Sequence, residues 1–153
     1  MHRLKSLLCF MPLLLSFSAY AETARFEDWV LECTPEPCIL TQSATETPLK
    51  VSVTQRQQGL FALIASPLGI SLPAGLTVMV DQLGAKRHVF ATCTVGGCLS
   101  AIPLVDDDLR AWQRGRLLQV SYQDGAGSSI TASISLLGFT AGHAALLAAG
   151  QTP

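Results

Sequence analysis

The chain lacks any cluster of basic residues. Its 153 residues include 10 Lys and Arg against 11 Asp and Glu, and charged side chains make up only 14% of the total. Proteins that bind nucleic acid through its phosphates carry a basic patch or stripe. We therefore expect no nucleic-acid partner for this protein.

The chain also lacks an apolar run long enough to cross a bilayer as a helix. Residues 6–17 are apolar, but a spanning helix needs about 20 such residues. A short basic segment, residues 2–5, precedes this run, and Ala19-Tyr20-Ala21 follows it as a small-x-small motif. This order predicts a secretory signal peptide over residues 1–21, cleaved after Ala21, with no membrane span in the remainder.

Cleavage would leave residues 22–153, a length typical of one domain. Arg3 and Lys5 leave with the signal, so eight basic residues remain against 11 acids, a net charge of −3. Cys9 leaves as well, so four of the five cysteines remain. An even number of cysteines in an exported chain indicates complete pairing. The expected location is the periplasm or the exterior of the cell.

The four remaining cysteines form two pairs with the same spacing. Cys33 and Cys38 bracket Thr-Pro-Glu-Pro, and Cys93 and Cys98 bracket Thr-Val-Gly-Gly. Each pair is flanked by apolar and β-branched residues, which predicts two hairpins with a disulfide at the mouth of each. Four cysteines allow three pairings, of which we favour the two local bonds. Redox motifs use two intervening residues, and exported cysteines oxidise more readily than they bind zinc.

The remaining sequence predicts a mainly β fold. Apolar and polar residues alternate over residues 49–55 and 130–136, which is the period of a half-buried strand. Strands are predicted over residues 29–33, 38–42, 49–55, 60–65, 76–80, 87–92, 98–104, 118–122 and 130–136, and short helices over 106–115 and 140–149. The pattern indicates a single-domain antiparallel β-sandwich or distorted barrel with two short helices.

Several segments together resemble the invasion-associated locus B family of bacterial envelope and secreted proteins. They are Pro-Leu-Gly-Ile-Ser-Leu-Pro-Ala-Gly-Leu-Thr-Val-Met-Val-Asp (67–81), Phe-Ala-Thr-Cys (90–93), Gly-Cys-Leu-Ser-Ala (97–101), Leu-Leu-Gly-Phe-Thr-Ala (136–141), and the opening hairpin at 29–33 and 38–42. The order and spacing of the cysteines carry much of this resemblance. This chain departs from it in having few residues between the predicted cleavage site and Trp29.

The resemblance implies a β-rich periplasmic or secreted protein that is linked, in the family's namesake, to invasion of host cells. It implies no enzyme activity, because the family has no established catalytic residues to carry over. The implied partner is an unknown protein or envelope component.

The residues themselves also predict no catalytic, cofactor-binding or metal site. His88 and His143 are the only histidines after residue 21, and no serine lies in a nucleophile-elbow motif. The three acids at 106–108 lack the alternate spacing of a calcium loop and suit a helix N-terminus. Trp29 and Trp112 are better explained as core anchors than as sugar-stacking residues.

We therefore predict a non-enzymatic exported protein that acts by binding. One alternative is a small periplasmic hydrolase that uses His88 or His143 as its base. Another is an inhibitor-like module that presents the disulfide-fixed loop from Thr34 to Pro37.

Overall fold

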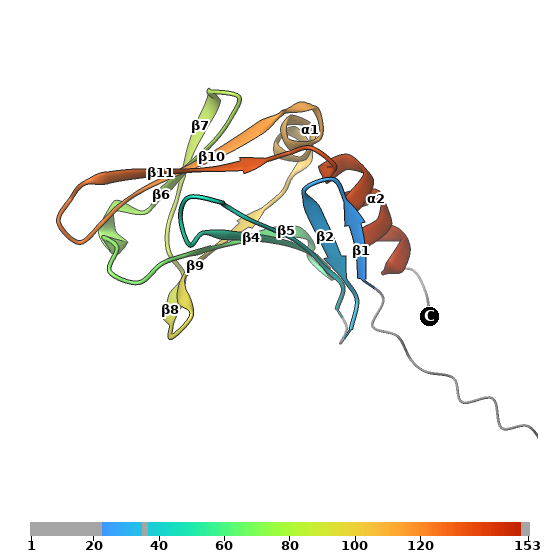
Figure 1. Cartoon of the computed structure of the whole chain (residues 1–153), viewed down its shortest axis with the longest axis horizontal. Helices are drawn as coiled ribbons and strands as arrows, with labels where there is room; N and C mark the ends of the chain where they lie inside the picture. Colours follow the sequence, from blue (N-terminus) through green and yellow to red (C-terminus); the bar gives the residue numbers. More distant parts are fainter. Residues whose placement is uncertain (1–22, 35–36, 151–153) are drawn as a thin grey trace, which may run out of the picture.

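The computed structural model describes residues 23–34 and 37–150, where eleven strands form two antiparallel sheets (Figure 1). The predicted signal peptide, its cleavage site and Cys9 lie outside the described residues. The mainly β fold class with two helices is confirmed. The described strands do not close into a barrel, so the two-sheet alternative is the correct one.

The larger sheet has seven strands in the order β1-β2-β3-β4-β5-β9-β8. Its strands are β1 (Thr23–Phe26), β2 (Trp29–Glu32), β3 (Ile39–Ser43), β4 (Lys50–Arg56), β5 (Gly59–Ser66), β8 (Thr92–Thr94) and β9 (Gly97–Pro103). The first five neighbours follow chain order, so most of this sheet is a meander. The β8–β9 hairpin joins it from a later part of the chain by pairing β9 with β5.

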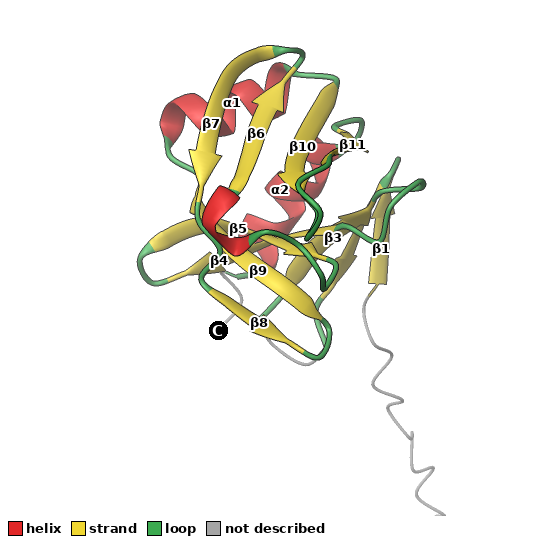
Figure 2. Cartoon of the chain, turned by 90° about the vertical axis from the view of Figure 1, so that its left-hand side faces the viewer, coloured by secondary structure: helices red, strands yellow, loops and turns green. Residues whose placement is uncertain are grey.

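The smaller sheet has four strands in the order β11-β10-β6-β7. They are β6 (Leu76–Val80), β7 (Leu83–His88), β10 (Leu117–Gln123) and β11 (Ser129–Ser135). These strands run across those of the larger sheet, and α1 (Asp106–Arg114) lies behind β6 and β7 in the view of Figure 2. The second helix, α2 (Phe139–Ala149), packs against β1 and β2 (Figure 1). No helix in the described ranges is long and apolar enough to cross a membrane.

The inner faces of the two sheets supply the core. In β10, Leu118, Val120 and Tyr122 are buried, while the intervening polar side chains are partly exposed. The apolar run of β5 follows the same period, with Ala62 and Ile64 fully buried. Burying one large aliphatic side chain contributes about 1.5–3 kcal/mol, so this alternation is what holds the sheets together.

Four rings form an aromatic cluster at the junction of both helices with β2. The fully buried ring of Phe139 lies at its centre. Its centroid is 5.2 Å from that of Trp29, 5.4 Å from Trp112 and 6.0 Å from His143. The indole Nε1 of Trp29 donates a hydrogen bond to the Ser135 carbonyl at 3.0 Å, so this buried polar atom is satisfied.

A glycine makes the entry into α2 possible. Gly138 has φ 84°, in the left-handed region that side chains disfavour. A Cβ atom at this position would lie 2.0 Å from the carbonyl oxygen of Phe26. The chain can therefore turn from β11 directly into α2 and place Phe139 under the β1–β2 hairpin.

Two local predictions about strands are wrong. The strand predicted over residues 87–92 is two shorter ones, β7 and β8, with residues 89–91 between them. The turn before β7 lies at Asp81 and Gln82, which take φ values of 47° and 64°. Aspartate tolerates this conformation better than most residues, so the chain turns there and β7 begins at Leu83. The first strand, β1, has no counterpart among the predicted strands.

Both cysteine pairs lie at disulfide distance. The sulfur atoms are 2.14 Å apart in Cys33 and Cys38, and 2.12 Å apart in Cys93 and Cys98. The second pair sits directly across the β8–β9 ladder, and the first lies between β2 and β3. Residues 35 and 36, which are half of the proposed inhibitory loop from Thr34 to Pro37, fall outside the described part of the chain.

Candidate ligand-binding cleft

A cleft of about 380 Å³ lies between α1 and the β6–β7 hairpin. Its apolar lining includes Val78, Val80, Leu83, Ile102, Leu104, Ala111 and Trp112. Ile102, Leu104 and Trp112 are buried and form the floor, whereas Leu83 is 75% exposed. A concave, mainly apolar surface of this size is the usual form of a small-molecule site.

Two polar side chains of β7, Lys86 and His88, line the cleft from the side of the smaller sheet. Lys86 lies opposite Val78 and His88 opposite Leu76, so these polar side chains share the sheet face of two core residues. The opposite side of the cleft is formed by Ile102 of β9, in the larger sheet, by Leu104 directly after it, and by α1.

The tip of the β6–β7 hairpin is anchored to the segment that follows α1. The Asp81 carboxylate accepts hydrogen bonds from the backbone N–H groups of Arg116, at 3.1 Å, and Leu117, at 2.9 Å. The Asp81 N–H donates to the Leu117 carbonyl at 2.9 Å. Val80 also packs closely on Gly115, where a Cβ atom would lie 2.3 Å from Val80 Cγ1. These contacts fix the width of the cleft at the C-terminal end of α1.

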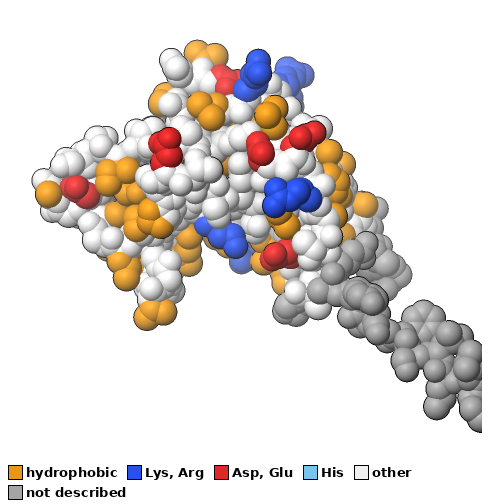
Figure 3. Space-filling model, viewed as in Figure 1, with side chains coloured by type: hydrophobic (Ala, Val, Ile, Leu, Met, Phe, Trp, Pro, Cys, Tyr) orange, Lys and Arg blue, Asp and Glu red, His pale blue; other side chains and the backbone are white. Residues whose placement is uncertain are grey.

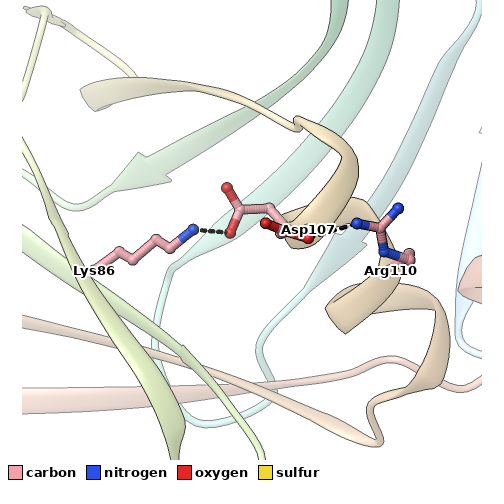
Figure 4. Close-up of polar contacts among 4 residues, drawn as sticks. Lys86, Asp107 and Arg110 are labelled. Carbon is pink, nitrogen blue, oxygen red and sulfur yellow. Dashed lines mark hydrogen bonds and ion pairs between the residues drawn. The ribbon is translucent and has the colours of Figure 1, made fainter.

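An ion pair bridges the cleft near the other end of α1. Lys86 reaches from β7 to the Asp108 carboxylate in the first helical turn (Figure 4). The neighbouring Asp107 accepts a hydrogen bond from Arg110 at 2.5 Å on the same helix. Both acids are therefore neutralised locally, and exposed pairs of this kind contribute only about 0–1 kcal/mol each.

Arg114 is the cationic lining residue that has no partner among the described residues. It lies in the last turn of α1 and has no hydrogen bond or ion pair within residues 23–34 and 37–150. Lys and Arg side chains gather near α1 at the top of the molecule in Figure 3. His88 adds little positive charge near neutral pH. Partial burial lowers its pKa; the Asp108 carboxylate acts against this shift, and Lys86 adds to it.

The structure does not bring the two candidate histidines into a common site. His88 lines the cleft, whereas His143 stacks on Phe139 and approaches the side-chain amide of Gln113 at 3.4 Å. Neither ring has a hydrogen bond to a serine, threonine or cysteine side chain in the described part of the chain. Burial lowers the pKa of His143, as expected for a ring enclosed in a core.

The acidic run at 106–108 forms the first turn of α1, as predicted. Its carboxylates lie at the positive end of the helix dipole, which favours negative charge there. Within the described residues, no three His, Cys, Asp or Glu side chains are grouped so that they could hold a metal ion. Trp29 and Trp112 are both buried, so their interpretation as core anchors is confirmed.

The fold and the sequence both match known proteins. The family model described as "Invasion associated locus B (IalB) protein" matches residues 29–147, which is most of the chain. The chain belongs to the invasion-associated locus B family. The resemblance noted in the sequence is thereby confirmed.

A solved structure has the same architecture. The crystal structure of invasion associated protein B from Bartonella henselae superposes with a TM-score of 0.77 and 18% sequence identity. The match covers 86% of this chain and 99% of that chain. At this identity the likeness shows the fold alone. No curated protein sequence matches the chain significantly.

The sequence did not reveal the cleft. Its floor comes from β9 and α1, and its roof from β6 and β7, so the lining residues are scattered over residues 78–115. The one available signal was a helix with acids at its start and Arg114 at its end, placed directly after an apolar strand. That signal predicts the helix but not the space above it.

Proposed function

We propose that this protein acts by binding, as a non-enzymatic exported protein of the periplasm or the cell exterior. The observation that carries the proposal is the apolar cleft between α1 and the β6–β7 hairpin. Two cysteine pairs at disulfide distance support an oxidising compartment, where such bonds persist. Membership of an envelope-associated family supports the same location.

The arrangement of the histidines favours binding over hydrolysis. A hydrolase of the serine type needs a base in hydrogen-bond reach of its nucleophile and a third group that orients the base. His143 is enclosed by Phe139 and Gln113, and His88 stands between Lys86 and Asp108. These surroundings favour a structural role for His143 and a cleft-lining role for His88.

The partner that we propose is a component of the envelope or of a host cell. The related solved protein is described as invasion associated, and this description is the support for a host context. The mildly acidic composition of the chain favours neither nucleic acid nor a polyanionic surface.

A neutral apolar dye tests whether the cleft binds ligands. N-phenyl-1-naphthylamine should bind the exported chain saturably, at one site, with increased fluorescence. Ala111→Leu places a larger side chain in the lining and should weaken this binding at least tenfold. Ala144→Leu makes the same change on the exposed side of α2 and should leave binding unchanged. Equal dye binding by Ala111→Leu and the unmodified protein would overturn the cleft as the site.

A further inference from the structure

We propose that the cleft holds a free fatty acid, with its acyl chain over the apolar floor and its carboxylate at Arg114. This inference rests on the proposed function, because it names the ligand class of the same cleft. Three observations support it: the shape of the cleft, the unpartnered cation Arg114 in its lining, and the features of β7 that oppose the addition of a peptide strand.

Arg114 lies at one end of the cleft, and the Lys86–Asp108 ion pair bridges the cleft near the other. Arg114 and Gly115 end α1 beside Val80, and Val80 lies opposite Leu83 in the β6–β7 ladder. The other end lies near the first turn of α1, where Lys86 pairs with Asp108 and the preceding residues Ile102 and Leu104 form the floor. A ligand with a charged head at Arg114 would therefore place an apolar tail along the floor.

The one lining cation without a partner among the described residues points to an acidic head group. Four carboxylate or cationic groups of the lining are already engaged: Asp81 by backbone N–H groups, Asp107 by Arg110, and Asp108 and Lys86 by each other. Arg114 is the lining cation that has no such partner within residues 23–34 and 37–150. Guanidinium binds carboxylate with two parallel hydrogen bonds, so a carboxylate complements this end of the cleft.

The size and lining of the cleft favour one acyl chain. A volume of about 380 Å³ is near the lower end of the roughly 300–1,000 Å³ of small-molecule sites. A lipid with two or more chains would exceed it. A sugar or nucleotide would need free hydrogen-bonding groups along its length, whereas here the polar lining groups are mostly engaged with each other.

A peptide strand added to the free edge of β7 is the competing occupant, and three features oppose it. Lys86 and Arg87 place charges on this edge strand, and a register shift between Val78 and Val80 distorts its ladder with β6. Arg87 is further held by the Pro73 and Ala74 carbonyls, at 2.7 and 2.9 Å. Edge charges and bulges are the means by which proteins prevent strand addition.

Calorimetry with dodecanoate, dodecanol and dodecyltrimethylammonium, each below its micelle-forming concentration, tests the proposal. Dodecanoate should bind at one site and more tightly than the other two. Arg114→Gln should weaken dodecanoate binding about threefold to fivefold, the size expected for an exposed ion pair, without changing dodecanol binding. Arg56→Gln removes the same charge from an exposed position on β4 and should have no effect.

The outcomes separate this inference from the proposed function. If the neutral dye binds but dodecanoate has no advantage over dodecanol, the fatty-acid assignment is wrong and the cleft remains a binding site. If Arg114→Gln leaves the preference for dodecanoate intact, the assigned position of the carboxylate is wrong. If neither the dye nor dodecanoate binds, the proposed function and the ligand class both fail.

Discussion

The indole ring of Trp112 meets the phenyl ring of Phe139 edge-on, with centroids 5.4 Å apart and planes inclined by 63°. Trp112 also forms part of the cleft floor. The floor is therefore the outer side of the aromatic cluster that joins both helices to β2. A ligand in the cleft would rest on the same packing that stabilises the fold.

Phe139→Ala should strongly destabilise the protein. The ring is fully buried and contacts Trp29, Trp112 and His143, so its removal leaves a cavity at the centre of the cluster. Truncation of a buried Phe costs about 3–5 kcal/mol, against a total stability of about 5–15 kcal/mol. Thermal denaturation should show a sharply lower midpoint. Leu137→Ala, at an exposed neighbouring position, serves as the control. An unchanged midpoint for Phe139→Ala would contradict the central role of this ring.

Gly138→Ala should destabilise more than Gly127→Ala. Both glycines have left-handed φ values, 84° and 87°, so both substitutions incur strain of about 1–2 kcal/mol. Only at Gly138 would the new methyl group meet the Phe26 carbonyl, whereas nothing lies within 4 Å of a Cβ at Gly127. Urea denaturation of the two variants measures the difference. Equal losses of unfolding free energy in the two variants would mean that the β1–β2 hairpin shifts away from the new methyl group without destabilising the fold.

Acid should reduce the stability of the fold through His143. The ring is 7% exposed and its burial lowers the pKa, so the folded state holds it neutral. The unfolded chain takes up a proton below about pH 6.5, so the free energy of unfolding should fall as the pH drops from there toward the lowered pKa. His88 has a lowered pKa and contributes in the same direction. Denaturant titrations at pH 7.5 and 5.5 should show a smaller pH effect in His143→Gln than in the unmodified protein. The same pH effect in both proteins would exclude His143 as a cause of the loss of stability in acid.

Peptide mapping without reduction should recover Cys33 linked to Cys38 and Cys93 linked to Cys98. Each bond closes a short loop, so each should contribute only about 2 kcal/mol in the chain-entropy model. The reduced protein should therefore remain folded at 25 °C with a lower melting midpoint. A crosslink between the two hairpins, such as Cys33 with Cys93, is the result that would contradict the local pairing.

The exported protein should begin at Glu22. Ala19 and Ala21 fit the small-residue rule for signal cleavage, and the apolar segment ends just before them. N-terminal sequencing of protein recovered outside the cytoplasm should read Glu-Thr-Ala. Recovery of intact Met1 on the mature protein would remove the basis for an exported location.

The sequence predicted the fold well wherever one face of an element is buried. Residues 49–55 and 130–136 alternate because their apolar side chains face the core, and they became β4 and β11. The same rule failed at β7, where almost every side chain is exposed and no alternation can arise. The dipeptide Asp81-Gln82, rather than a glycine, sets the turn there, so the boundary could not be read from glycine positions.

The candidate site could not be predicted from the sequence, because its residues come from elements that are far apart in the chain. The cleft depends on the relative positions of β7 and α1, which are separated in the chain by β8 and β9. Lys86 and Asp108 lie 22 positions apart and carry no shared motif. Nothing in the sequence indicated that His88 lines a cleft and that His143 lies in the core.

The short span of both cysteine pairs has a consequence for how the reduced chain oxidises. Partners are only five positions apart, and each pair sits beside strands that follow directly in the chain. The entropic cost of bringing two positions together rises with the length between them, by about 0.6 kcal/mol per doubling. Correct partners therefore meet more often than any partner from the other hairpin. Each bond can form as soon as its own hairpin has emerged, so correct pairing requires neither a completed chain nor later reshuffling.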